Sequence, residues 1–512
     1  MILTQVTIER FVVESQPPAP GTEPMADSLS LRGVQPFLDD ALIASSAGLT
    51  RTFHRPHKTG EILLEVDQPW EEGGHLSSYC SVKRENGTTR LWYGVSSERY
   101  RHIAYAESDD GLQFRKPILN LRELGGSKTN NVILEEPVAG VAPFVDPNAS
   151  ADGRYGLFVK AYPAWPQAKS PTEFRRYTSP DGLDWTQRPV DQIGDVDTQH
   201  VAFWNRVLSR YVLYTRKWSR FDNRHLNFRS VRRLESDDLE HWDDTGVVWT
   251  AEEEELAARD THTGQPALDY YGATVFPYPH TDAPCYVALA QAYWHWLERL
   301  EDEKWGPSGD PQRAIIERLR PAAMEVHFLF SRDGISWQRP TAGAAFMGVG
   351  HAGHFDSKYT WALPDPIDMG DELWIYYVGS NQDHDQFVDP EAPSRLSGLS
   401  RAVLRRDGYA SLDAGREGGE LTTLPFLMRE GLRLNVDTGA GGCLRAEIQD
   451  AGGTPIDGWE MAASIPLCTN STRTPLQWKS GVDPASLSGR QVRLRLSLID
   501  ARLFALVMDE AT

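Results

Sequence analysis

Cysteine is scarce in this sequence, with 4 among 512 residues. The four stand far apart, at Cys80, Cys285, Cys443 and Cys468, and no CxxC pair occurs. A disulfide framework and a cysteine-based structural zinc site are therefore disfavoured. The chain must be held together by apolar cores, which its 40% hydrophobic and 10% aromatic residues can supply.

Basic residues are also in short supply relative to acidic ones. Lys+Arg number 52 and Asp+Glu number 72, so the formal net charge is 52 − 72 = −20. Phosphate backbones bind basic surfaces, so we expect no nucleic-acid partner. A neutral or cationic substrate fits the overall charge better.

Long apolar runs are absent as well. We find no stretch of about eighteen uninterrupted apolar residues, which is the length that a membrane-spanning helix requires. The first 24 residues lack the basic region and apolar run of a secretory signal. We therefore expect no membrane partner and a cytoplasmic location.

What the sequence does contain is a repeated word, which in four of its five examples is built around Asp-Gly. The five examples are SDDGLQF (108–114), SPDGLDW (179–185), SDDLEHW (236–242), SRDGISW (331–337) and RRDGYASL (405–412). Asp-Gly suits a tight turn, and the Trp that ends three of the words is expected to wedge between neighbouring sheets. The spacing of the words indicates tandem structural units.

Each unit also holds a run rich in aromatic and β-branched residues. These runs cover residues 89–95, 154–162, 210–218, 285–294 and 372–380. Their alternation and composition predict strands and not helices. Five such units predict an all-β fold with a five-bladed β-propeller, which removes long sheet edges by radial repetition. Two stacked β-sandwiches are the alternative.

The remaining sequence predicts the domain organisation. Residues 1–35 form an N-terminal arm, residues 36–418 the propeller, and residues 419–512 a C-terminal β-sandwich of short strands and Gly-rich turns. Residues 296–321 are the clear helical stretch of the sequence. We expect them to be an insertion between blade strands, which forms either a lid or a contact at the rim such as a homo-oligomer interface.

One acid precedes the aromatic strand in every unit. These acids are Glu71, Asp146, Asp197, Asp269 and Asp356. The inner strands of a propeller converge on an axial pocket, so we expect the five carboxylates to meet there. Glycosidic bond hydrolysis needs one carboxyl group to protonate the leaving oxygen and another to act as nucleophile or base. Turn capping or ion pairing at the strand ends is the alternative for each of them.

With these features the chain resembles the five-bladed propeller glycosidases of the arabinanase, levansucrase and invertase type. The resemblance rests on the Asp146-Pro147 pair, the S-x-D-G-x-x-W words and the trailing sandwich region, and it covers about residue 36 to the end. The chain is more closely similar to bacterial glycosidase-like propellers that open with a PFLDD-type segment followed by RTFHRPHK and DQPWE.

The resemblance implies three catalytic carboxylates. Glu71, or its neighbour Glu72, matches the first-blade carboxylate, and Asp146 matches the aspartate that stabilises the transition state. Asp197 stands where the family places a glutamate as general acid. The Arg of an Arg-Asp-Pro motif and the first-blade Asn-Asp-Pro signature are both missing, so a fructosidase is disfavoured.

Further residues are predicted to bind substrate. They are Arg216, Asp269, Tyr271, Trp294, His354, Asp356 and His384. The histidines near Asp356 suit sugar hydroxyls or a structural divalent cation on the axis, and we expect no other cofactor. The aromatic rings suit stacking on sugars, with packing between blades as the alternative.

These features together predict a glycoside hydrolase with a carbohydrate substrate. We expect it to be exo-acting on a small oligosaccharide or glycoside. The alternatives are a glycoside phosphorylase, which uses phosphate in place of water, and a carbohydrate-binding propeller without catalysis. The separation of the carboxylates distinguishes these hypotheses, because hydrolysis needs two of them close to one bond.

Overall fold

The computed structural model describes residues 31–508, except for 97–100, 164–171, 195–196, 198, 221–226, 253–266, 280, 282, 296–321, 342, 385–388, 390, 393, 395 and 430. The predicted helical insertion at 296–321 and most of the predicted arm therefore lie outside the described residues. Within the described part, the chain forms mainly antiparallel sheets and four short 3₁₀ helices, with no α-helix. The prediction of an all-β fold is confirmed.

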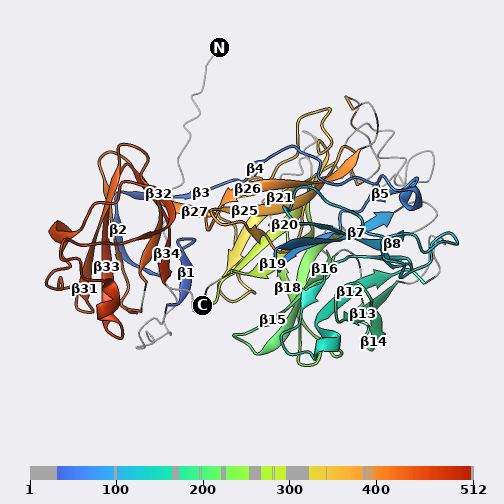
Figure 1. Ribbon diagram of the computed structural model, residues 1–512, viewed down its shortest axis with the longest axis horizontal. Helices are drawn as coiled ribbons and strands as arrows, with labels where there is room; N and C mark the ends of the chain where they lie inside the picture. Colours follow the sequence, from blue (N-terminus) through green and yellow to red (C-terminus); the bar gives the residue numbers. More distant parts are fainter. Residues whose placement is uncertain are drawn as a thin grey trace, which may run out of the picture.

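The first three sheets follow one another along the chain (Figure 1). The first contains β5 (His75–Leu76), β6 (Ser81–Glu85), β7 (Thr88–Ser96), β8 (Arg101–Ser108) and β9 (Val132–Leu134). The second contains β10 (Val138–Ala139), β11 (Phe144–Val145), β12 (Tyr155–Ala161), β13 (Glu173–Ser179) and β14 (Thr186–Arg188). The third contains β15 (Val201–Asn205), β16 (Arg210–Arg220), β17 (Asn227–Ser236) and β18 (Asp243–Trp249).

The fourth sheet combines two groups of strands. One group is β19 (Ala267–Pro277), β20 (Tyr286–His295), β21 (Ala323–Ser331) and β22 (Trp337–Gln338). The other is β23 (Tyr359–Ala362), β24 (Ile367–Asp368), β25 (Glu372–Ser380) and β26 (Ser397–Arg405), with β4 (His57–Lys58) added at its edge. A parallel pairing of Met324 with Tyr359 joins the groups. Because this pairing makes one continuous sheet, the number of five blades stays a prediction.

Each predicted aromatic run forms a central strand of its group. The runs correspond to β7, β12, β16, β20 and β25, and most of their side chains are buried on both faces. Burial on both faces explains why these strands read as nearly continuous apolar and aromatic sequence. The prediction of strands at these positions is confirmed.

The repeated Ser-x-Asp words form the turns that were predicted for them. In the turn after β21, the Gly334 amide donates to Ser331 Oγ at 2.8 Å, and the Asp333 carboxylate accepts from the amides of the two residues after Gly334. Corresponding bonds occur in the turns that begin at Ser108, Ser179 and Ser236. The fifth word differs, because it leads into β27 (Ala410–Ala414), which belongs to another sheet.

These turns also join neighbouring sheets. Three of their glycine carbonyls accept a hydrogen bond from an aromatic side chain of the preceding group: Gly182 from Trp92 at 2.7 Å, Gly334 from Tyr214 at 2.6 Å and Gly111 from Tyr376 at 2.7 Å. The last of these bonds connects the first sheet to β25, so the contacts run round in a ring. Trp337 packs edge-on against Tyr214 and Trp249 of the third sheet, as the wedge prediction requires. Radial contacts of this kind are typical of a β-propeller.

Gly334 occupies a position where a side chain is expected to destabilise the fold. Its φ is +72°, and a Cβ there would lie 2.7 Å from the Tyr214 hydroxyl and 2.9 Å from an Arg233 guanidinium nitrogen. Gly87 has a similar φ of +85° but open space around it. We expect Gly334→Ala to lower the free energy of unfolding by about 1–3 kcal/mol more than Gly87→Ala, because the clash adds to the backbone strain. Urea unfolding of both variants measures this difference, and equal losses would contradict it.

Two further sheets share one apolar core near the C-terminus. The first contains β1 (Gly33–Pro36), β3 (Leu49–Phe53), β27, β30 (Arg433–Asp437), β32 (Asn470–Pro475) and β34 (Ala501–Met508). The second contains β2 (Ile43–Ala47), β28 (Gly419–Thr423), β29 (Phe426–Leu427), β31 (Cys443–Asp450) and β33 (Gln491–Ile499). Buried residues of both sheets, among them Leu434, Leu444 and Leu503, form a single cluster.

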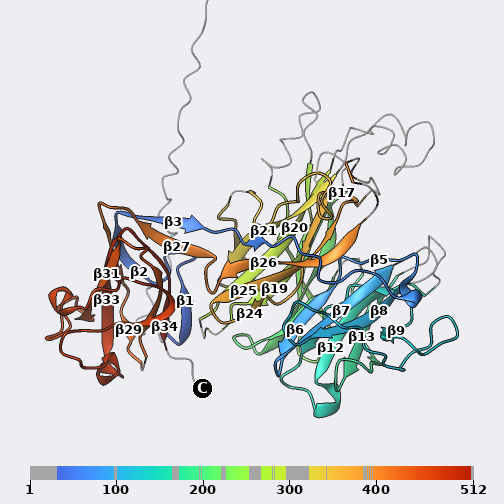
Figure 2. The same ribbon diagram turned by 45° about the horizontal axis from the view of Figure 1, so that its top comes forward.

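The strand pairing corrects the predicted domain boundaries. β1, β2 and β3 pair with β34, β28 and β27, so residues 33–53 belong with the C-terminal strands and not with an arm or a propeller blade. Figures 1 and 2 show these blue strands among the red and orange ones. The sequence places them hundreds of residues from their partners, and for that reason composition along the chain could not assign them.

Candidate functional site

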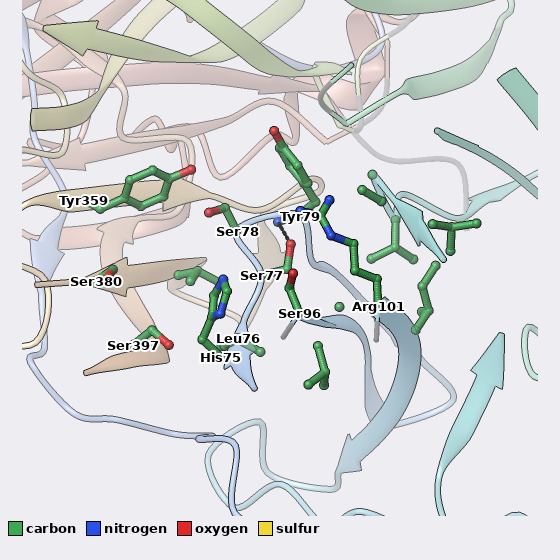
Figure 3. Close-up of a pocket in the computed structure, with 18 of the residues that line it drawn as sticks. His75, Leu76, Ser77, Ser78, Tyr79, Ser96, Arg101, Tyr359, Ser380 and Ser397 are labelled. Carbon is green, nitrogen blue, oxygen red and sulfur yellow. Dashed lines mark hydrogen bonds between the residues drawn. The ribbon is translucent and has the colours of Figure 1, made fainter. Parts of the chain in front are cut away.

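A large pocket opens where the sheets converge. Its cavity volume is about 1210 Å³, and its lining comes from residues between Pro69 and Ser397. Figure 3 shows the part of the lining that comes from the first and fourth sheets. Ser78, Tyr79 and Tyr359 lie near one another, and Ser380 and Ser397 lie on the adjacent strands β25 and β26. The polar and aromatic residues of the lining include Glu72, His75, Ser77, Ser78, Tyr79, Ser96, Arg101, Lys160, Tyr162, Asp197, Tyr271, Tyr359, Ser380, Gln382, Asp383, His384 and Ser397.

Asp197 lies in this pocket between two cations. It precedes β15, and its two carboxylate oxygens pair with Lys160 Nζ at 2.9 Å and with an Arg216 guanidinium nitrogen at 2.6 Å. Lys160 comes from β12 and Arg216 from β16, so residues of two sheets fix the orientation of the carboxylate. The Arg216 side chain is 5% exposed, whereas Asp197 is 25% exposed and accessible from the pocket.

Tyr271 enters the pocket from a β-bulge in β19. Tyr270 pairs with Ala292 and Gly272 pairs with Gln291, so Tyr271 is the extra residue on this strand. Bulges are common next to active sites, where they redirect a side chain. The Tyr271 hydroxyl lies 3.0 Å from His384 Nε2, which joins two residues that the sequence predicted separately.

The surroundings of Tyr271 lower the pKa of its hydroxyl. Burial and the Asp197 carboxylate raise this pKa, but the interactions with His384, Arg229 and Arg216 outweigh them, and the net pKa is lowered. The pKa of Tyr79 is raised well above its ordinary value by burial and by Tyr271 and Asp197. Two neighbouring tyrosines of the pocket are therefore shifted in opposite directions.

Asp269 lies behind the pocket and not in its lining. It is 1% exposed, and its carboxylate pairs with an Arg229 guanidinium nitrogen at 2.9 Å. The Arg229 guanidinium in turn lies 4.6 Å from the centre of the Tyr271 ring. The predicted substrate-binding role of Asp269 is corrected to a position that supports Arg229.

Two carboxylates of the pocket lining were not among the main catalytic residues predicted from the sequence. Asp383 is buried, and one of its oxygens accepts a hydrogen bond from the Ala322 amide at 2.9 Å. It directly precedes His384, so the SNQDHD segment held the signal that could have identified it. Glu72 is exposed and also lines the pocket, as the alternative to Glu71.

Glu71 itself does not line the pocket, which corrects its prediction as a catalytic residue. Its side chain is fully buried and caps a 3₁₀ helix at Pro69–Glu71. One oxygen accepts from the Tyr93 hydroxyl at 2.6 Å, and the other pairs with Lys116 Nζ at 2.7 Å. These bonds make Glu71 part of the packing of the first sheet.

Asp146 also lies outside the central pocket. It occupies a turn between β11 and β12, where one oxygen accepts hydrogen bonds from the Tyr211 hydroxyl at 2.8 Å and from the Asn148 amide at 2.9 Å. It lines a separate, smaller cavity of about 290 Å³. The structure therefore places Asp146 apart from Asp197, in a turn whose cavity shares no lining residue with the central pocket, which corrects its prediction as a member of that site.

The remaining predicted binding residues are not brought together. Asp356 is buried against Lys58 Nζ at 2.5 Å and the Tyr377 hydroxyl at 3.1 Å, outside the pocket lining. His354 lies in the loop before it and is also absent from the lining. Trp294 donates from Nε1 to Glu325 Oε1 at 2.9 Å and packs towards His327. The structure thus does not bring these three residues into the lining of the central pocket, and a role for them in binding substrate stays a prediction.

Among the residues that the structure describes, no group of three or more His, Cys, Asp or Glu side chains is arranged to hold a metal ion. The expected axial cation therefore has no set of ligands in this part of the chain. The described residues also contain no helix of the length and apolarity that a membrane crossing needs.

Comparisons with known proteins place glycoside hydrolases among similar solved structures. The sequence matches no family model and no curated protein. One similar structure, titled a glycoside hydrolase, is 13% identical, covers 69% of this chain and 93% of its own, and has a TM-score of 0.42. A thermostable family-43 glycoside hydrolase is 12% identical over 70% of this chain and 95% of its own, with a TM-score of 0.41.

A third similar structure is an N-acetylgalactosamine deacetylase from F. plautii. It is 13% identical over 71% of this chain and 97% of its own, with a TM-score of 0.43. At these identities and TM-scores the likenesses say nothing of the activity of this chain. Its function has to be argued from the pocket.

Proposed function

We propose that this protein is a glycoside hydrolase whose active site is the central pocket. The observation that carries the proposal is that three carboxylates from separate segments, Glu72, Asp197 and Asp383, line one cavity. Most enzymes that hydrolyse a glycosidic bond use two carboxyl groups beside the bond. In some of them another side chain takes the place of one carboxyl group.

The rest of the lining supports a carbohydrate ligand. Four serine hydroxyls of the lining suit hydrogen bonds to sugar hydroxyls. Ser77 and Ser78 come from the first sheet region, and Ser380 and Ser397 come from the fourth sheet. Tyr79, Tyr271 and Tyr359 present aromatic rings, which pack against the apolar faces of sugars. A cavity of about 1210 Å³ has room for more than one sugar ring.

We assign to Asp197 the stabilisation of the positive charge that develops on the sugar ring during the reaction. Lys160 and Arg216 hold its two oxygens in place, so its orientation is set before the substrate arrives. A preorganised charge of this kind stabilises the transition state without reorganisation during the reaction.

A screen of 4-nitrophenyl glycosides tests the proposal. We expect the protein to release nitrophenol from at least one sugar of the panel, and to do so equally well in Asp146→Asn, whose substitution lies outside the pocket. Absence of release across the panel, with small oligosaccharides also intact by chromatography, would overturn the proposal. Turnover that requires inorganic phosphate would instead indicate phosphorolysis, for which the lining offers Arg101, His75 and His384 as side chains that can donate hydrogen bonds to phosphate.

A further inference from the structure

The Tyr271 side chain is surrounded by polar and basic groups from several elements, with His384 and Tyr79 at its hydroxyl and two arginines at its ring. His384 Nε2 lies 3.0 Å away, and Tyr79 forms a hydrogen bond with it. The guanidinium groups of Arg229 and Arg216 lie 4.6 Å and 5.6 Å from the centre of the Tyr271 ring. These groups come from β17, β16, the segment after β5 and the segment after β25.

The neighbouring tyrosine on the same strand has a different environment. Tyr270 is fully buried, and its hydroxyl lies 3.2 Å from Nδ1 of His327, which belongs to β21 of the same sheet. The bulge thus assigns one tyrosine to the core and the next to the pocket. Packing alone accounts for Tyr270, but it does not account for a phenol placed beside two guanidinium groups and a histidine at the pocket wall.

We propose that Tyr271 is the acid–base catalyst of the central pocket and that His384 is the residue that positions its hydroxyl. This inference rests on the proposed glycoside hydrolase function and names the group that moves the proton. It assigns the proton transfer to Tyr271 and not to a carboxyl group of the lining, since Asp197 is held in two ion pairs, Asp383 is buried and accepts a hydrogen bond from the Ala322 amide, and Glu72 is exposed to solvent.

The proton balance is simple. As the bond between the anomeric carbon and the glycosidic oxygen breaks, that oxygen keeps the electron pair and takes the proton of the Tyr271 hydroxyl. The phenolate that remains is stabilised by His384, Arg229 and Arg216. Water then adds to the anomeric carbon through its oxygen and gives one proton back to the phenolate, so Tyr271 ends as it began.

The electrostatics agree with this role. A phenol of ordinary pKa, near 10, is a poor proton donor at neutral pH. The positive charges around Tyr271 lower its pKa against the effect of burial, which brings the group nearer to the range where an acid–base catalyst is efficient. The charged and titratable groups that face it include Asp197, Arg216, Arg229 and His384 and the three tyrosines Tyr79, Tyr293 and Tyr359.

Tyr271→Phe tests the assignment when leaving groups are compared. We expect kcat/KM for the phenyl glycoside of the accepted sugar to fall by about 10²–10⁴-fold. For the dinitrophenyl glycoside, whose leaving group needs no proton, we expect a fall of less than about 10-fold, because the missing step is not needed there. Tyr270→Phe is the matched control, and we expect it to treat both substrates as the parent protein does.

His384→Gln tests the positioning role. It keeps a hydrogen-bonding group near Tyr271 but removes the positive charge, so the basic limb of the pH–rate profile is expected to move to higher pH. Ultraviolet difference spectra report the same tyrosine ionisation without substrate, and the early-titrating tyrosine should be missing in Tyr271→Phe.

The outcomes separate the two proposals. Equal losses for both leaving groups in Tyr271→Phe, or an unchanged pH profile in His384→Gln, would overturn the inference alone. A parent protein that cleaves no glycoside would overturn the proposed function and this inference together.

Discussion

Replacing Asp197 by asparagine is expected to lower kcat/KM by about 10⁴-fold on any glycoside that the parent protein cleaves. This is the size of effect that follows when a charged catalytic aspartate is replaced, and it corresponds to about 5.4 kcal/mol of transition-state stabilisation. Asparagine has nearly the same shape but no negative charge. The variant therefore removes the interaction with the positive sugar ring and keeps the space filled.

The ion pairs of Asp197 determine how the experiment must be controlled. The Asp197→Asn substitution would leave Lys160 and Arg216 without their shared carboxylate, and Arg216 is almost fully buried. Some stability will be lost for that reason, so the circular dichroism spectrum and the urea midpoint have to be measured beside kcat/KM. A folded variant with the parent rate would show that Asp197 serves only to neutralise the two cations. Asp146→Asn, which changes the same atoms outside the pocket, is the matched control.

Replacing Glu71 by alanine is expected to lower the free energy of unfolding by about 3–5 kcal/mol, because it leaves a buried charge without its partner. Lys116 is 7% exposed and pairs with Glu71 at 2.7 Å, and the Tyr93 hydroxyl also loses its acceptor. Denaturant unfolding of the purified protein measures the loss. Lys116 keeps its second pair with Asp67, which is exposed and screened by solvent.

Glu72→Ala is the control for this prediction. The two glutamates are adjacent in sequence, but Glu72 is exposed at the pocket, so its removal should change stability by no more than about 0.5 kcal/mol. The double variant Glu71→Gln/Lys116→Met should recover part of the loss, since it removes both charges together. Equal effects of Glu71→Ala and Glu72→Ala would show that the Glu71–Lys116 pair contributes nothing to stability.

The strands and turns were predictable from local sequence. The Ser-x-Asp words form their hydrogen bonds within three residues, as at Ser331 and Asp333, so the pattern of residues defines the geometry. The aromatic runs such as that of β25 are buried on both faces, and burial leaves a clear compositional mark. These features predicted the all-β fold and the order of the repeats.

The catalytic residues were less predictable, because an acid upstream of a strand has no fixed direction. Asp146 and Asp197 occupy equivalent positions in the sequence pattern, yet Asp197 lies in the central pocket and Asp146 lies in a turn that lines another cavity. Glu71 and Glu72 differ by one residue, and one is buried while the other faces the pocket. Such differences depend on a turn or one residue of register, which spacing along a single chain does not determine.

The overall charge was equally uninformative about the pocket. A net charge of −20 favoured neutral or cationic ligands, but Arg101, Lys160 and two histidines line the cavity beside the three carboxylates. Net charge sums over the whole surface, whereas a binding site is determined by the few groups that converge on it.

The sequence by itself determined what depends on near neighbours: the scarcity of cysteine that makes apolar cores necessary, the strands, the turns and their repetition. The tertiary structure decided what depends on distant segments meeting. It placed β1 to β3 among the C-terminal strands, turned Glu71 into the core, and brought Tyr271 to His384 across more than a hundred residues. The physical reason is the distance along the chain over which the interactions act. Hydrogen bonds within a turn join residues two or three positions apart, whereas a pocket forms only when the sheets have closed around it.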